Sequence, residues 1–297
     1  RSADEVDAFM TAMRQLVRYL EISDGNMEQG SLRCDCNISV RLKGATEYGQ
    51  RCEVKNLNSM RFARQAIKYE TKRQIDLIEK GGAVKQQTLN FDPATGKTST
   101  LRTKENAHDY RYFPEPDLPP IVITETYIKQ IKQALPPLPN QLFETFTSKY
   151  GLSAYDATIL IEEKGTALFF NELCQHTSYY KAAANLTINK LLPYSKENDL
   201  SWSSFPVAYS QLAAFIDLIE SDKVSNSVAY GQIFPALMKR PTVPPLQLAE
   251  QMNLLQSDDT DFLQEIIDKL ILDYPDKVKA YQKGKKGLIG FFMGELM

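Results

Sequence analysis

The chain has 297 residues, of which 43% are hydrophobic and 24% are charged, and its formal net charge is -2. This length allows two or three domains, and the composition is typical of a soluble globular protein. The near-neutral charge argues against a strongly basic nucleic-acid binder, although it does not exclude a local basic patch.

The four cysteines do not form a recognisable disulfide framework or zinc site. They are Cys34, Cys36, Cys52 and Cys174, without a CxxC pair, and the chain has only two histidines. We therefore expect reduced thiols that are buried in the core. No apolar run reaches the roughly 18 residues of a membrane span, and no signal peptide opens the chain. These features predict a cytoplasmic protein.

The first predicted element is an amphipathic helix. Ser2 and Glu5 have the spacing of a capping box, and apolar residues follow them at helical intervals. We expect these apolar residues to form a conventional buried face: Val6, Phe9, Met10, Met13, Leu16, Val17 and Leu20. A turn at residues 24–26 follows the helix.

Residues 31–42 alternate strictly, which predicts a β-strand with two different faces. The apolar face contains Leu32, Cys34, Cys36, Ile38, Val40 and Leu42. The polar face contains Arg33, Asp35, Asn37, Ser39 and Arg41. Residues 51–55 alternate in the same way after a short loop, so the two strands should form an antiparallel hairpin. A slip of one residue would bury every charge, and both polar faces should therefore lie on one side of the sheet.

A long helix and further strands follow the hairpin. Ser59 is a plausible cap for a helix that continues to Lys80, where two glycines stop it. Strands are predicted at residues 84–91 and 98–103, with a turn between them. Residues 118–124 are a further strand candidate.

The second half of the chain has a helical pattern. Helices are predicted within residues 139–192, at 207–220 and at 226–239, and the remainder of the chain is helical as well. Proline clusters at residues 136–139 and 241–245 mark plausible domain boundaries.

The polar face of the hairpin is the first candidate site. Its ionic and amide groups, with one carboxylate from the preceding turn, are Glu28, Arg33, Asp35, Asn37, Ser39, Glu53 and Lys55. Three carboxylates beside two cations suit a magnesium ion and a phosphoryl group. The alternative is a solvated sheet face with cross-strand ion pairs, such as Arg33 with Glu53.

Two other stretches are weaker candidates. The aromatic and charged residues at 108–111 could hold a nucleotide or the end of a tRNA, or they could form a structured loop. Lysines gather near the C-terminus, where they could contact a phosphate backbone or form a solvated helix face. These lysines are Lys277, Lys279, Lys283, Lys285 and Lys286. The chain contains no P-loop, GxGxxG, nucleophile elbow or HExxH motif.

Three stretches resemble the B subunits (GatB) of the aspartyl/glutamyl-tRNA amidotransferases. They are MEQGSLRCD at residues 27–35, EVKNLNS at 53–59 and HDYRYFPEPD at 108–117. The resemblance covers essentially the whole chain. It implies an α+β fold in which a cradle domain with a partial antiparallel sheet, related to glutamine synthetase, precedes an all-α helical domain and a small YqeY-like α-helical tail. The implied domain ranges are 1–124, 125–243 and 244–297.

The resemblance also implies a ligase that acts in translation as a heterotrimer. The A subunit is an amidase that releases ammonia from glutamine, and the small C subunit wraps around both partners. The B subunit uses ATP and Mg²⁺ to phosphorylate the side-chain carboxylate of Glu on tRNA(Gln) or of Asp on tRNA(Asn). Ammonia then displaces the phosphate and forms the amide.

The family motifs suggest roles for individual residues. The residues expected to act in catalysis are Glu28, Arg33, Asp35, Glu53 and Lys55, and the three carboxylates among them would also contact the metal. The residues expected to orient the nucleotide are Asn37, Asn56, Asn58, His108 and Arg111. The residues expected to contact tRNA are Lys279, Lys283, Lys285 and Lys286.

The chain departs from the family pattern at both ends. Arg1 aligns inside the cradle, and the last tail helices have no counterpart. We therefore expect a fragment that does not phosphorylate misacylated tRNA by itself. The competing hypothesis is a non-catalytic tRNA-binding module. No inserted domain of the archaeal E subunit fits between Pro120 and Pro136, which favours a B-type chain.

Overall fold

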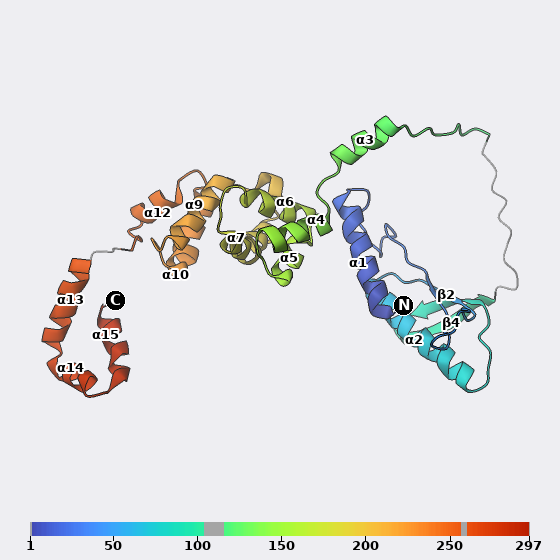
Figure 1. Ribbon diagram of the computed structural model, residues 1–297, viewed down its shortest axis with the longest axis horizontal. Helices are drawn as coiled ribbons and strands as arrows, with labels where there is room; N and C mark the ends of the chain where they lie inside the picture. The colour runs from blue at the N-terminus through green and yellow to red at the C-terminus, as the bar shows by residue number, and fades with distance from the viewer. Residues whose placement is uncertain (1, 104–115, 257–259, 297) are drawn as a thin grey trace. The chain divides into compact units, whose positions relative to one another are not determined.

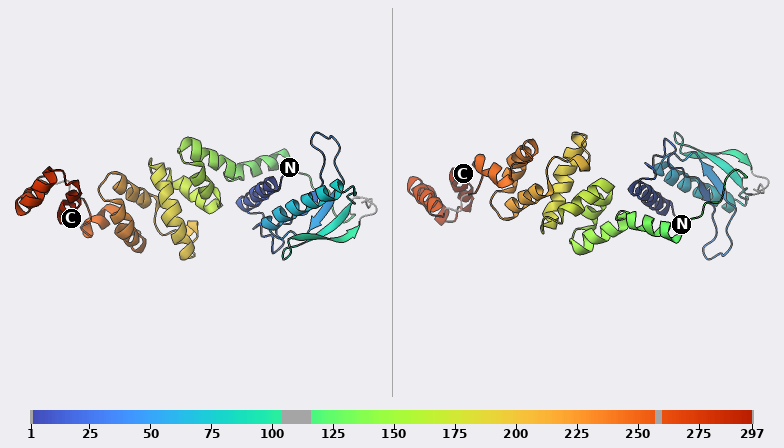
Figure 2. Two further views of the ribbon diagram at one scale, coloured as in Figure 1. Left: turned by 90° about the horizontal axis from the view of Figure 1, so that it is seen from below. Right: turned by 90° about the horizontal axis from the view of Figure 1, so that it is seen from above.

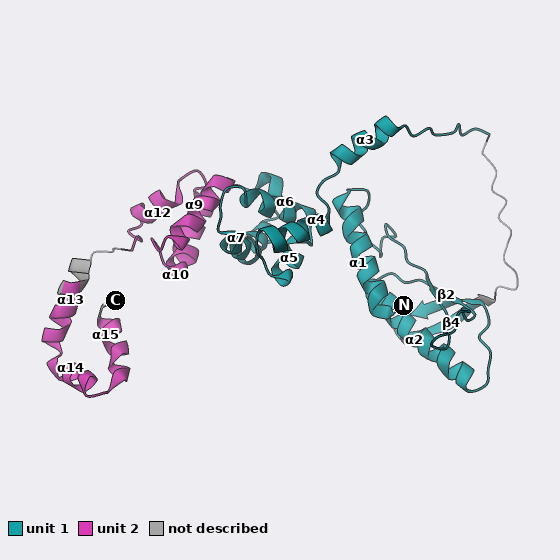
Figure 3. Ribbon diagram, in the orientation of Figure 1, with its two compact units in different colours: residues 1–205 teal, residues 206–297 magenta. Residues whose placement is uncertain are grey.

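The computed structural model of the chain describes residues 2–103, 116–256 and 260–296. These residues form two compact units, Arg1–Phe205 and Pro206–Met297 (Figure 3). The first unit contains a small sheet and helices, and the second unit is helical, so the predicted α+β architecture is confirmed. Within the described residues, no helix combines the length and the apolar character that crossing a bilayer requires.

Helix α1 (Ala3–Tyr19) begins at the predicted cap, because the Ser2 hydroxyl accepts the backbone N–H of Glu5 at 3.1 Å. Its buried face is narrower than the apolar pattern predicts. Phe9 and Met13 are 63% and 36% exposed. The prediction of a conventional buried face is therefore wrong for these two residues. The reason is that α1 packs mainly against α2 (Met60–Glu79), with the first turns of the two helices side by side (Figure 1). This packing leaves part of the apolar face of α1 uncovered.

The first unit contains a four-stranded sheet in the order β1-β2-β3-β4. The strands are β1 (Cys36–Ile38), β2 (Cys52–Lys55), β3 (Gln87–Asp92) and β4 (Lys97–Thr103). The predicted hairpin is confirmed, since β1 and β2 pair antiparallel with Asn37 opposite Glu53. The sheet is mixed rather than purely antiparallel, however, because β2 and β3 pair in parallel. A parallel pair needs a long crossover, and helix α2 supplies it.

Two strand predictions are corrected by the structure. Strand β1 covers only Cys36–Ile38, although the alternating pattern extends over residues 31–42. The chain before it turns instead, with the backbone N–H of Ser31 donating to the carbonyl of Asn26 at 2.9 Å. Residues 118–124 form no strand. An alternating pattern favours an extended backbone, but a strand also needs a paired neighbour, and β2 is only four residues long.

Helix α2 lies along the sheet, as both views in Figure 2 show, and it is fixed there by a buried charge. Glu70 is 0% exposed and forms an ion pair with Arg73, whose Nη2 lies 2.6 Å from Oε1. Gln74 and the Thr98 hydroxyl of β4 also donate to this carboxylate, at 2.9 and 3.1 Å. The carboxylate therefore has partners from both α2 and the sheet, as a buried charge requires.

Helices make up the rest of the first unit. They are α3 (Glu125–Ala134), α4 (Pro139–Glu144), α5 (Ala154–Ile161), α6 (Lys164–Leu173), α7 (Tyr180–Leu186) and α8 (Leu192–Glu197), with the shorter helical turns η1 (Thr145–Lys149), η2 (Thr187–Leu191) and η3 (Trp202–Ser204). The carbonyl of Ile161 at the end of α5 accepts from Gln15 Nε2 at 2.6 Å and from the Tyr19 hydroxyl at 2.7 Å. Helix α1 therefore connects the sheet region to this helical region.

In the second unit, the regular elements at residues 206–256 and 260–296 are all helical. They are α9 (Tyr209–Glu220), α10 (Asn226–Val228), η4 (Ala229–Ile233), α11 (Phe234–Lys239), α12 (Pro245–Gln251), α13 (Thr260–Asp273), α14 (Pro275–Gln282), η5 (Lys286–Leu288) and α15 (Ile289–Leu296). Helix α9 packs against α12, and Phe215 makes an edge contact with Tyr230. The two units are divided between Phe205 and Pro206. The division at 1–124, 125–243 and 244–297 stays a prediction.

Candidate functional site

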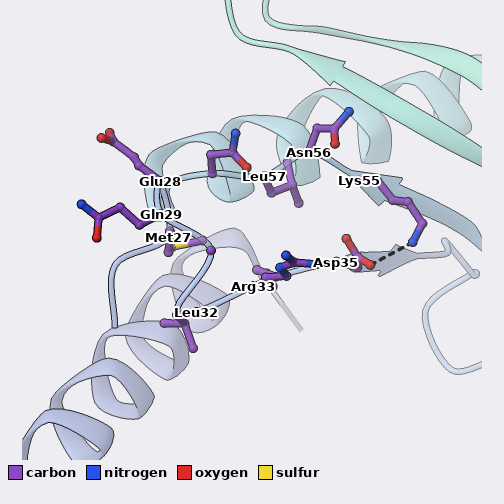
Figure 4. Close-up of a pocket in the computed structure, with 12 residues that line it drawn as sticks. Met27, Glu28, Gln29, Leu32, Arg33, Asp35, Lys55, Asn56 and Leu57 are labelled. Atoms are coloured by element: carbon purple, nitrogen blue, oxygen red, sulfur yellow. Dashed lines mark hydrogen bonds and ion pairs between the residues drawn. The ribbon is translucent and has the colours of Figure 1, made fainter. Parts of the chain in front are cut away.

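A pocket of about 430 Å³ opens where the chain enters β1 and leaves β2 (Figure 4). Six of the residues expected to act in catalysis or nucleotide binding line it: Glu28, Arg33, Asp35, Lys55, Asn56 and Asn58. Two segments that are separate in the sequence supply them, namely the turn and the approach to β1 at residues 27–35 and the end of β2 with the residues after it at 55–58. The structure therefore brings most of the described candidate residues to one place.

The turn that carries Glu28 is built by Asn26. Its side-chain oxygen accepts the backbone N–H groups of Glu28 and Gln29 at 3.0 and 3.2 Å. Gly30 then adopts a φ of +79°, which a residue with a Cβ rarely adopts. A Cβ at Gly30 would lie 3.5 Å from the guanidinium of Arg33. The reversal at Gly30 therefore places Arg33 beside the turn, at the wall of the pocket.

Lys55 is held by two carboxylates. Its Nζ donates to Asp35 Oδ2 at 3.1 Å and lies 3.6 Å from Glu53 Oε1. The hydrogen bond to Asp35 and the negative charges of Asp35 and Glu53 raise the pKa of Lys55 above its ordinary value. Glu53 is itself fixed, because Oε2 accepts the hydroxyl of Thr88 at 3.0 Å. The cation at this end of β2 is therefore kept charged and oriented.

The alternative of a solvated face with cross-strand ion pairs gave Arg33 with Glu53 as its example. The structure shows ion pairs on this face that join Lys55 to Asp35 and to Glu53. Because Asn37 faces Glu53 across the hairpin, Asp35 comes opposite Lys55 instead. The register thus leaves the Arg33 side chain directed at the turn and the pocket rather than at β2 (Figure 4).

The amide residues divide between the pocket and its surroundings. Asn56 and Asn58 line the pocket, whereas Asn37 lies on β1 and lines a neighbouring groove. Asn56 has a φ of +63°, a conformation that asparagine tolerates better than most residues. Its side-chain amide donates to the side-chain oxygen of Asn90 on β3. This contact ties the end of β2 to the next strand.

The three expected metal ligands do not come together. Within the described residues, no group of three or more His, Cys, Asp and Glu side chains is arranged to hold a metal ion. Glu28 and Asp35 line the pocket, although the Glu28 side chain points away from Asp35 (Figure 4), and Glu53 is absent from the lining. Magnesium often takes only one or two protein carboxylates and completes its shell with water and substrate phosphates. One or two of these carboxylates would suffice for such a site, and the metal roles of Glu28, Asp35 and Glu53 stay predictions.

The sequence-based prediction missed a thiol pair at the pocket wall. Cys34 lines the pocket, and its sulfur lies 3.8 Å from that of Cys36. The hydrogen bond with Cys36 lowers the pKa of Cys34 to about 7, against the opposing effects of burial and of the Asp35 charge. The same hydrogen bond and burial raise the pKa of Cys36. The i, i+2 spacing on one strand face is the available signal, but by itself it indicates only core packing.

His108 and Arg111 lie outside the described residues, and their expected contacts with a nucleotide stay a prediction. The C-terminal lysines are described. Lys279, Lys283, Lys285 and Lys286 are all exposed, on or just after α14. Gly284 has a φ of +99°, and the backbone N–H of Lys285 donates to the carbonyl of Ala280 at 3.1 Å. This tight end of α14 keeps the four lysines close along the chain.

Comparison with known proteins identifies families and relatives that this chain resembles. Residues 1–129 match the family described as the GatB/GatE catalytic domain, and residues 168–297 match the GatB domain. Proteins from Paramagnetospirillum magneticum and Myxococcus xanthus, each named as the B subunit of an aspartyl/glutamyl-tRNA(Asn/Gln) amidotransferase, are 41% identical over 297 residues. A protein of the same name from Bartonella quintana is 43% identical over 298 residues. Each alignment covers all of this chain, which spans 61%, 62% and 58% of these relatives.

Proposed function

This chain belongs to the family of B subunits of aspartyl/glutamyl-tRNA(Asn/Gln) amidotransferases, and on that premise we propose that it activates a carboxylate with ATP. The proposed substrates are the side-chain carboxylates of Glu on tRNA(Gln) and of Asp on tRNA(Asn), which ammonia then converts to amides. The observation that carries the proposal is the gathering of six candidate residues around one polar pocket, with Lys55 fixed at its wall.

The chemistry explains why such a pocket is suitable. A carboxylate is a poor acyl electrophile because its leaving group would be oxide, and phosphorylation supplies a better leaving group. A catalyst of this step must mainly position the reactants and neutralise charge on the phosphoryl oxygens. Arg33 and Lys55 are the two cations of the pocket, and we assign this neutralising role to them.

The remaining residues have supporting roles in this proposal. Glu28 and Asp35 would hold Mg²⁺, which when bound supplies further positive charge at the phosphate oxygens. Glu53 would act through Lys55, since it contacts this cation and the Thr88 hydroxyl. Asn56 and Asn58 offer amide donors at the pocket wall, where they would orient the nucleotide.

The relatives are named as B subunits, which supports a role of this chain in a complex of several subunits. The proposed partners are those that the family resemblance implies, namely an amidase, the A subunit, and a small third protein, the C subunit. The proposed assembly is a cytoplasmic heterotrimer that binds tRNA(Gln) or tRNA(Asn). The chain covers about three fifths of these relatives. For this reason the expectation that the chain alone does not form product belongs to the proposal as well.

The proposal is tested by a transamidation assay with the A and C subunits, misacylated tRNA, ATP and Mg²⁺. We expect Lys55→Ala to lower the rate of amide formation by about 10²-fold or more, as the loss of one charge-stabilising donor typically does. The matched control is Lys97→Ala, which removes an exposed lysine from β4, the edge strand on the opposite side of the sheet from β1. An unchanged rate for Lys55→Ala would contradict the proposal, and turnover without the A and C subunits would contradict the expected inactivity of the chain alone.

A second candidate function is a non-catalytic tRNA-binding module. The observation that favours it is the group of four exposed lysines on α14 and directly after it. These lysines do not line the pocket, so they could bind tRNA without any reaction there. The two functions are separated by measuring ATP hydrolysis and tRNA binding on the same variants. Hydrolysis that depends on Mg²⁺ and is lost in Glu53→Ala supports activation, whereas binding that is lost only in Lys283→Ala/Lys285→Ala, without any hydrolysis, supports the module.

A further inference from the structure

Two sulfur atoms lie side by side where the chain enters β1. The Sγ atoms of Cys34 and Cys36 are 3.8 Å apart. Alternate residues of an extended chain point to the same side, which explains why the two thiols meet. Cys36 is the first paired residue of β1 and lies opposite Val54. Cys34 precedes that ladder, so its backbone is less constrained than that of Cys36.

The two thiols differ in their access to solvent. Cys34 is half-buried and lines the pocket, whereas Cys36 is 8% exposed and belongs to the core under α2. The other two thiols are more enclosed still. Cys52 is fully buried and donates to the carbonyl of Lys85, and Cys174 is buried among helices. An oxidant in solution therefore reaches Cys34 first, and the thiol of Cys36 lies beside it.

We propose that Cys34 and Cys36 are a site of reversible oxidation, at which a peroxide converts the two thiols into an intrachain disulfide. In the first step the sulfur of Cys34 attacks the peroxide, the O–O bond breaks, Cys34 becomes a sulfenic acid, and the second oxygen leaves as water or an alcohol. In the second step the sulfur of Cys36 attacks that of Cys34, the S–O bond breaks, and water leaves with the Cys36 proton. The dithiol loses two electrons, and the peroxide gains them.

The geometry allows this bond with a small local movement. A disulfide has sulfur atoms about 2.05 Å apart, so the two thiols must approach by about 1.8 Å from their present separation. The ladder with β2 holds Cys36, and the movement therefore falls on Cys34 and the turn before it. That turn is the part of the sheet region where the predicted strand does not form.

The modification would change the pocket, because Asp35 lies between the two cysteines in the sequence. Asp35 makes the 3.1 Å contact that orients Lys55. A ring closed across residues 34–36 restrains the backbone of Asp35 and changes where its carboxylate lies. The disulfide itself forms whatever the pocket binds, so the inference does not depend on the proposed function.

The experiment exposes the full 297-residue chain to hydrogen peroxide, alkylates the remaining thiols and maps the peptides by mass spectrometry. We expect the peptide with Cys34 and Cys36 to lose two hydrogens, Cys52 and Cys174 to stay alkylatable after denaturation, and dithiothreitol to reverse the change. Cys36→Ala should stop at a sulfenic acid on Cys34 that dimedone traps, and Cys34→Ala should leave Cys36 reduced at the same dose. Cys174→Ala is the matched control and should behave as the unmodified chain does.

A second probe needs no variant. Phenylarsine oxide bridges two neighbouring sulfurs, so it should protect Cys34 and Cys36 together from alkylation and leave Cys52 unaffected. Either of two results overturns the inference: disulfides mainly between chains, or oxidation of Cys34 in the unmodified chain to sulfenic or sulfinic acid without an intrachain bond. Protection of Cys34 alone by the arsenical would also overturn it.

Discussion

Lys55 illustrates how an exposed ion pair can matter for position more than for stability. Its side chain is 36% exposed and that of Asp35 is 48% exposed. Ion pairs at such exposure contribute about 0–1 kcal/mol to folding. The contacts with Asp35 and Glu53 nevertheless restrict the lysine to one side of the pocket. Removal of Lys55 should therefore affect the chemistry of the site while the fold persists.

Glu70 is the opposite case, since its charge is buried and structural. We expect Glu70→Ala to lower the local free energy of unfolding around α2 by about 1–3 kcal/mol, because the buried Gln74 amide and the partly exposed Arg73 guanidinium would lose their acceptor. Hydrogen exchange of the α2 amides measures this loss. The matched control is Glu79→Ala, an exposed carboxylate on the same helix, which should change the free energy by less than about 0.5 kcal/mol. Similar effects of the two substitutions would contradict the structural role of Glu70.

The same carboxylate predicts a pH dependence. Burial raises the pKa of Glu70, but the hydrogen bonds from Arg73, Gln74 and Thr98 and the Arg73 charge outweigh burial and leave the pKa below its ordinary value. A lowered pKa in the folded state stabilises the fold above the unfolded value of about 4.3 and ceases to do so as the pH falls through the folded value. The free energy of local opening around α2, obtained from hydrogen exchange after correction for the intrinsic exchange rate at each pH, should therefore fall on acidification in the native chain. Glu70→Gln should show a weaker pH dependence, and an equal one would contradict the assignment.

At the scale of elements, the turn before β1 decides the shape of the pocket. Gly30 and Gly44 both have a positive φ, at +79° and +90°. An alanine at either position should destabilise its loop by roughly 1 kcal/mol, because a Cβ disfavours that conformation. Only Gly30 lines the pocket and lies against Arg33. We therefore expect Gly30→Ala to weaken ATP binding, measured by calorimetry in the assembled enzyme, and Gly44→Ala to leave it unchanged. Equal effects would show that the turn does not shape the binding site.

A separate prediction concerns the lysines on α14 and in the turn after it. Lys283→Ala/Lys285→Ala should weaken tRNA binding and reduce the slope of log affinity against log salt by about two, because each phosphate contact contributes about one. Fluorescence anisotropy at several salt concentrations measures both effects. Lys223→Ala/Lys239→Ala removes two exposed lysines from another part of the same unit and serves as the control. A slope that both double variants change equally would contradict a specific lysine patch.

At the scale of the whole molecule, the two candidate functional regions lie in different units. The pocket is in the first unit, and the lysines are in the second. Within the first unit, the Tyr19 hydroxyl and Gln15 join α1 to the end of α5 through one carbonyl, that of Ile161. The sheet region and the neighbouring helices of this unit are therefore linked by directional bonds as well as by packing.

The helices and the hairpin register could be predicted because their determinants are local. Ser2 and Ser59 each cap the helix that the sequence predicts, since a cap needs only the next few residues. The alternating pattern predicts that Asn37 and Glu53 share a face, because burying the charged side would be costly. Motifs such as EVKNLNS are local as well, and they are sufficient to indicate the family.

The partners of individual side chains could not be predicted in the same way. The pairing of Lys55 with Asp35 depends on the exact opposition of two strands, and the alternating pattern is equally compatible with Arg33 and Glu53. The closeness of Cys34 and Cys36 depends on where the ladder of β1 begins. In both cases a shift of the backbone by less than the length of one side chain would change which side chains meet.

The class of fold, the helix starts, the hairpin and the family of this chain can be inferred from the amino-acid sequence, because each depends on neighbours along the chain or on short motifs. The length of β1, the parallel pairing of β2 with β3, and the set of candidate residues that line one pocket became visible only in the folded chain. These features depend on segments that are distant in the sequence and are brought together by the packing of α2 on the sheet. The contacts that stabilise these features join residues far apart in the sequence, so no local sequence pattern predicts them.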